Sequence, residues 1–110
     1  METIIALMKF YKTILDFAHW NNQGISDHWL FDDLRNEVDE VLDGCVERYL
    51  AFNKEVKYSD FLDITTRLQS SYSGFTKEDI LEYAQYMYGE VKEEGSIKDM
   101  LEKHIYLLKK

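Results

Sequence analysis

The chain has 110 residues, a length that supports one folded domain (residues 1–110) with a single hydrophobic core. Hydrophobic residues make up 45% of it, which excludes a disordered chain, and the absence of proline favours helices over a turn-rich β protein. The net charge of −8 disfavours direct binding to nucleic acid, because an acidic surface repels phosphates.

The first two helices are predicted on either side of the segment NNQGIS. Over residues 2–21 apolar side chains recur every three or four positions, which is the helical period. Gly24 is expected to stop this helix, and Ser26 or Asp27 to cap a long second helix over about residues 27–52.

A short helix is expected over about residues 60–69, with Ser59 as its cap. Thr76 and Asp79 form a capping-box pattern before a further helix over about residues 77–94.

Gly95 is expected to end that helix, and Ser96 with Asp99 repeats the capping signal for a last helix to about Leu108. The sequence therefore predicts an all-α four-helix bundle with a short helix in the connection between its second and third long helices. His104 in the last helix suggests only a favourable interaction with the helix dipole.

The second helix has an apolar face and a polar face. The apolar sector, expected in the core, contains Phe31, Leu34, Val38, Val41, Leu42, Cys45 and Tyr49. A different sector, about 100° wide, contains His28, Asp32, Asp39, Asp43 and Glu47.

Two interpretations of the polar sector are open. Acids opposite a core are usually only solvated. However, Trp29, Val46 and Leu50 flank or continue this sector, and such residues are typical of a second interface.

The spacing of the polar residues favours a site shared between two chains. His28–Asp32 and Asp43–Glu47 are i, i+4 pairs about 16 Å apart along the helix, too far for one ion to bridge. Two antiparallel copies related by a two-fold axis would bring the two pairs together. With His19 from the preceding helix, the set has the composition of a non-haem iron site.

These motifs resemble the Dps-type miniferritins of the ferritin-like superfamily. In that family the first helix ends in H-W-N-x-x-G, and the second contains H-x-x-x-D and D-x-x-x-E-R with ten residues between the acids. The matching residues are His19-Trp20-Asn21 with Gly24, His28 with Asp32, and Asp43 with Glu47-Arg48. The loop between the two histidines is three residues shorter than the family pattern, and the second half of the chain matches more loosely.

The resemblance implies a ferritin-like bundle that binds iron (Fe2+/Fe3+) between the subunits of a homodimer or larger homo-oligomer. The implied metal ligands are His19, His28 and Asp32 of one subunit with Asp43 and Glu47 of its partner. In that family such a site oxidises Fe(II) with peroxide or dioxygen, so a ferroxidase-like activity is expected if the site is intact.

Two alternatives remain open. The first is an acidic helical protein-interaction module, such as a phage-type inhibitor or partner-binding protein, that binds a protein through the acidic face without metal chemistry. The second is a structural subunit of a larger assembly.

The sequence favours a cytoplasmic protein without a membrane anchor. No apolar run approaches the ~20 residues of a transmembrane helix. Glu2 and the absence of a small-residue cleavage site argue against a signal peptide. Cys45 is the only cysteine, so a buried free thiol is expected.

Overall fold

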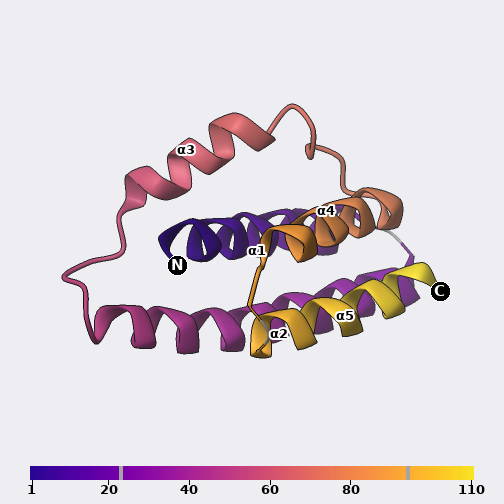
Figure 1. Cartoon of the computed structure of the whole chain (residues 1–110). Helices are drawn as coiled ribbons and strands as arrows, with labels where there is room; N and C mark the ends of the chain where they lie inside the picture. Colours follow the sequence, from indigo (N-terminus) through magenta and orange to yellow (C-terminus); the bar gives the residue numbers. More distant parts are fainter. Residues whose placement is uncertain (23, 94) are drawn as a thin grey trace.

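A computed structural model describes residues 1–22, 24–93 and 95–110, and these ranges are helical, with no strand (Figure 1). The helices are α1 (Glu2–Asn21), α2 (Ile25–Leu50), α3 (Tyr58–Leu68), α4 (Lys77–Glu90) and α5 (Ser96–Lys109). The all-α prediction is confirmed. Within the part of the chain that is described, none of these helices combines the length and the hydrophobicity needed to cross a bilayer.

Four of the helices form a bundle. α1 packs against α2, α2 against α5, α5 against α4, and α4 against α1. In Figure 1, α2 and α4 run in the same direction, so the connection between them has to return along the bundle. The short helix α3 lies in this connection and packs on the outer side of α1.

The core contains the apolar face that the sequence predicts for α2. Phe31, Leu34, Val38, Leu42 and Cys45 are all buried. Val41 and Tyr49 are partly buried against the same core. The Cys45 thiol is free, as predicted, and its sulfur lies 3.3 Å from a guanidinium nitrogen of Arg48.

The turn between α1 and α2 differs from the sequence prediction. α2 begins at Ile25 with Gly24 as its N-cap, so the expected caps Ser26 and Asp27 are wrong. The backbone N–H of Gly24 donates to the side-chain oxygen of Asn22 at 2.9 Å, and this local bond sets the turn.

The predicted start of α3 is also wrong. α3 begins at Tyr58, earlier than predicted, with Lys57 as its N-cap and no hydrogen bond from a capping side chain, so Ser59 lies inside the helix. By contrast, the Thr76–Asp79 capping box at the start of α4 is confirmed, with both of its reciprocal hydrogen bonds present.

α4 ends earlier than the sequence predicts. Its last residue is Glu90, and Val91 has an extended backbone (φ −85°, ψ 108°) that turns the buried Val91 side chain into the core. The predicted end at residue 94 lies outside the described residues. Gly95, at φ 147°, is the N-cap of α5, and Ser96, the expected cap, is already the first helical residue.

Candidate metal site

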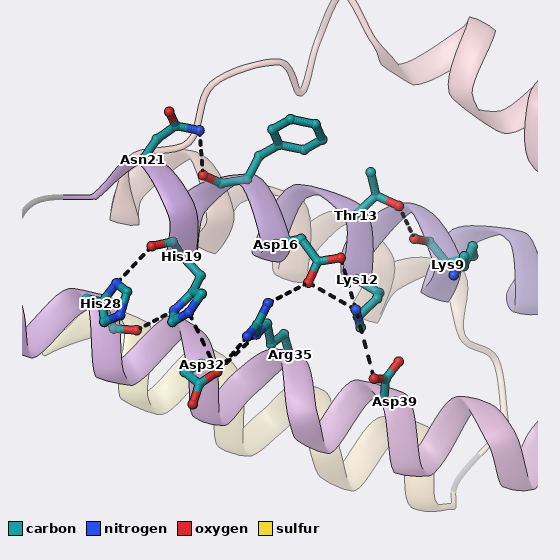
Figure 2. A network of polar contacts seen from close by, with 11 residues as sticks. Lys9, Lys12, Thr13, Asp16, His19, Asn21, His28, Asp32, Arg35 and Asp39 are labelled. Atoms are coloured by element: carbon teal, nitrogen blue, oxygen red, sulfur yellow. Dashed lines mark hydrogen bonds and ion pairs between the residues drawn. The ribbon is translucent and has the colours of Figure 1, made fainter.

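The α1–α2 hairpin brings the two predicted histidine ligands together. His19 comes from the last turn of α1 and His28 from the first turns of α2. Their imidazole rings stack with centroids 3.9 Å apart and an angle of 25° between their planes (Figure 2). The short loop therefore keeps His19 beside His28.

Two reciprocal hydrogen bonds fix these rings. Nδ1 of His19 lies 3.0 Å from the backbone carbonyl of His28, and Nδ1 of His28 lies 2.9 Å from the backbone carbonyl of His19. Because a carbonyl can only accept, each Nδ1 carries a proton and donates it. In the neutral rings the lone pair is then on Nε2, the arrangement that metal-binding histidines have in proteins.

Asp32 lies next to this pair but already binds another cation. Its Oδ1 is 3.8 Å from Nε2 of His19. The same oxygen accepts a hydrogen bond from Nε of Arg35 at 3.0 Å and forms an ion pair with Nη2 of the same guanidinium at 2.9 Å. A metal ion at Asp32 would therefore compete with this guanidinium.

The ion-pair network continues along the α1–α2 interface (Figure 2). A guanidinium nitrogen of Arg35 is 3.2 Å from Asp16, which also pairs with Lys12 at 2.9 Å. Lys12 lies 3.8 Å from the Asp39 carboxylate. Sequence reasoning missed these two basic residues, although the i, i+4 spacing of Lys12 and Asp16 is a signal for such a pair.

Asp43 and Glu47 lie further along α2, and both are exposed. In the described part of the chain neither carboxylate has a hydrogen bond or an ion pair in its own subunit. Asp43 borders a groove of about 380 Å³ beneath the start of α3, whose apolar wall includes Val46 and Phe61. A single chain does not bring these acids to the histidine pair.

The described residues contain no group of three or more histidine, cysteine or acidic side chains that could hold a metal ion. The histidine pair and Asp32 are three of the five predicted ligands, and Asp43 and Glu47 would have to come from another copy.

The surface around the histidine pair is apolar. The rings of Trp29 and His28 form a T-shaped contact with centroids 5.7 Å apart, and Trp29 is 59% exposed. Trp20 and Ile25, from the two ends of the hairpin turn, are 60% and 77% exposed. Exposed apolar side chains next to a polar site are typical of a surface that another molecule covers.

His104 does not make the interaction with the helix dipole that the sequence suggested. Instead of interacting with a helix end, it is fully buried and bonds to side chains of two other helices. Its Nδ1 lies 2.8 Å from the Tyr11 hydroxyl and its Nε2 lies 2.8 Å from Glu37. Burial lowers the pKa of His104, an effect that the Glu37 carboxylate only partly offsets.

Comparison of the chain with protein-family models, with curated proteins and with solved structures finds no match in any of the three. The relation to Dps-type miniferritins therefore stays a hypothesis based on the motifs.

Proposed function

We propose that this protein is a ferritin-like, Dps-like helical bundle that binds ferrous iron at a site shared between two copies of the chain. One copy contributes His19, His28 and Asp32, and the partner contributes Asp43 and Glu47. The observation that most supports the proposal is the reciprocal bonding of the two histidines, which leaves both Nε2 atoms available to a metal.

The topology also supports the proposal. A ferritin-like fold is a four-helix bundle with one long crossover connection, and the α2–α4 connection that contains α3 runs in that manner (Figure 1).

The ligand chemistry suits iron. Imidazole and carboxylate groups are ligands for non-haem iron, with bonds of roughly 2.0–2.2 Å as in other nitrogen and oxygen metal sites. The 3.8 Å separation between Nε2 of His19 and Oδ1 of Asp32 is a span that one ion can bridge with two such bonds. Carboxylates bind both ferrous and ferric iron. The proposal therefore includes oxidation of Fe(II) by peroxide or dioxygen at this site.

A two-fold axis crossing α2 would complete the ligand set. An axis near Glu37 and Val38 relates residues at equal distances on either side of it in two antiparallel copies of α2. The facing pairs are His28 with Glu47, Asp32 with Asp43, Trp29 with Val46, and Ile25 with Leu50. Ligands thus face ligands, and exposed apolar side chains face apolar ones.

Complementation between two inactive variants tests the shared site. The first variant, H28A/D32A, lacks one half of each site, and the second, D43A/E47A, lacks the other half. Each variant alone should bind no ferrous iron in an anaerobic titration. After unfolding and refolding together, the equimolar mixture should recover roughly one quarter of wild-type capacity, because half of the dimers are mixed and each has one intact site of two.

A mixture that binds no more iron than its components would contradict the shared site. As a control, H28A/D32A is refolded with an H19A variant, which lacks a ligand from the same half. This second mixture should recover nothing.

A second candidate is the acidic interaction module, and the Arg35–Asp32 pair favours it. Asp32 is already neutralised by a guanidinium, so part of the acidic column is a structural network. In this alternative, the exposed acids Asp43 and Glu47, with Trp29, bind a basic protein surface. A protein that dimerises but takes up no iron, or one that neither dimerises nor takes up iron, would favour this interaction module.

A further inference from the structure

A chain of hydrogen bonds crosses the core at a distance from the candidate metal site. It links Tyr11 on α1, His104 on α5 and Glu37 on α2. Tyr11 and His104 are completely buried, whereas the Glu37 side chain is 31% exposed. The second oxygen of Glu37 accepts from Lys103 at 3.2 Å.

The protons in this chain can be assigned from its acids and bases. Partial burial works to raise the pKa of Glu37, but the hydrogen bonds and charges of His104 and Lys103 outweigh it and hold that pKa below its ordinary value. Glu37 is therefore a carboxylate and accepts from Nε2–H of His104. Nδ1 of His104 then has a lone pair, which accepts the hydroxyl proton of Tyr11.

Tyr83 provides an internal comparison. Its ring lies 5.5 Å from that of Tyr11, measured between centroids, and it is equally buried. Its hydroxyl, however, donates to the backbone carbonyl of Leu7 at 2.7 Å. A peptide carbonyl is too weak a base to take the proton, whereas an imidazole can take it.

A phenol that loses an electron becomes a very strong acid, so its oxidation is easiest where a base already accepts its hydrogen bond. We propose that Tyr11 is a redox-active tyrosine in which loss of one electron is coupled to transfer of the hydroxyl proton to His104. A one-electron oxidant of the radical class, such as a hydroxyl or azidyl radical, takes the electron and is reduced. The products are a neutral tyrosyl radical and a His104 imidazolium paired with the Glu37 carboxylate, and return of one electron and the proton restores Tyr11.

Adjacent aromatic rings connect Tyr11 to the edge of the core. Tyr72 is half-buried, and its ring centroid lies 5.1 Å from that of Tyr83, which in turn contacts Tyr11. Tyr86 lies 5.5 Å from Tyr72 and 6.0 Å from Tyr83. If an oxidant removes an electron from a tyrosine at this edge, electron transfer from ring to ring can move the oxidation inward to Tyr11. It stops there because His104 accepts the hydroxyl proton of Tyr11.

This inference does not depend on iron binding, since the oxidant in the test is supplied from outside. Azidyl radicals generated by pulse radiolysis oxidise wild-type protein, Tyr11→Phe and Tyr83→Phe, two variants that each lose one buried hydroxyl. Tyrosyl radical is followed by its absorbance and, after freezing, by electron paramagnetic resonance. Thermal melts establish that each variant is folded.

The wild type should form a long-lived tyrosyl radical, and Tyr11→Phe should lose it. Tyr83→Phe keeps the hydrogen bond between Tyr11 and His104 but removes a ring of the path to Tyr11, so it should form the same long-lived radical in equal or lower yield. In the wild type its decay rate should be independent of protein concentration, because a buried radical cannot couple with another molecule to form dityrosine. An undiminished long-lived radical in Tyr11→Phe would overturn the proposal. If that variant does not fold, a wild-type radical that decays faster at higher protein concentration and yields dityrosine would overturn it.

Discussion

His19 and His28 each donate a ring N–H to the backbone carbonyl of the other, at 3.0 and 2.9 Å. The two bonds join the end of α1 to the start of α2, so the same contacts close the hairpin and orient the rings. A metal that bound through the Nε2 atoms would meet rings already fixed in position, which reduces the cost of ordering them.

The Arg35–Asp32 pair leads to a prediction about metal affinity. Arg35→Gln removes the cation that occupies Oδ1 of Asp32, so ferrous iron should bind more tightly. The gain should be at most roughly fivefold, because an ion pair of this partial exposure is worth about 0.2–1 kcal/mol. Anaerobic titration measures the change in Kd.

Lys12→Gln is the matched control for this change. Lys12 pairs with Asp16 and Asp39 but not with Asp32, so its replacement should leave iron affinity close to wild type. If both substitutions raised affinity equally, the effect would be general electrostatics and not release of Asp32.

Two leucines of α2 test the assignment of its faces. Leu42 is 7% exposed in the core, and Leu42→Ala should lower the free energy of unfolding by ~2–5 kcal/mol. Leu50 is 43% exposed, and Leu50→Ala should change the stability of the monomer by less than ~0.5 kcal/mol. Urea unfolding at low protein concentration measures both values, and equal losses would contradict the assignment.

The capping box at α4 predicts a local effect. Thr76→Ala removes the hydroxyl that accepts from the backbone N–H of Asp79, at a cost of about 1 kcal/mol. Thr13→Ala loses only a hydroxyl bond to the carbonyl of Lys9 within α1 and should cost less than ~0.5 kcal/mol. Comparison of the two melting curves checks the difference.

Stability should fall on mild acidification because of His104. Its pKa is lowered in the folded protein, so below its ordinary value of 6.5 the unfolded chain binds a proton that the folded chain resists. Stability is therefore fully present above that pH and declines below it. The lowered pKa of Glu37 adds a loss of the same sign at more acidic pH, below its ordinary value of 4.5.

The measurement is urea unfolding of the wild type and His104→Gln between about pH 7 and about pH 5. The variant keeps every other ionisable group of the wild type, so the difference in slope isolates His104. The variant should be less stable at neutral pH and lose less on acidification. Parallel pH curves for the two proteins would contradict this role of His104.

The helical faces could be predicted from sequence because burial follows the helical period. Phe31, Val38 and Cys45 recur at intervals of seven, and all three are fully buried. Helix ends were less predictable. Asn22 forms the first turn through a side-chain bond, and α4 stops early as Val91 enters the core, which local capping patterns do not encode.

The candidate site was predictable only in part. The spacing of His19, His28 and Asp32 indicated that they gather. The ion pair of Asp32 with Arg35 is an i, i+3 contact within α2, so its spacing was also a signal in the sequence. The contact of Arg35 with Asp16 joins α2 to α1 and depends on how the two helices pack. His104 and Tyr11 are 93 positions apart, so their contact depends on the packing of α5 against the rest of the bundle. No local pattern announces such a pair.

Anaerobic titration of the wild-type protein with Fe(II), beside Asp43→Asn, tests the central claim most directly. The substitution removes a carboxylate that has no partner among the described residues of its own chain, so it should leave the fold intact. The wild type should bind about one or two ions per chain with saturation, and the variant should lose most of this binding. Equal binding by both proteins, or none by the wild type, would contradict an iron site shared between subunits.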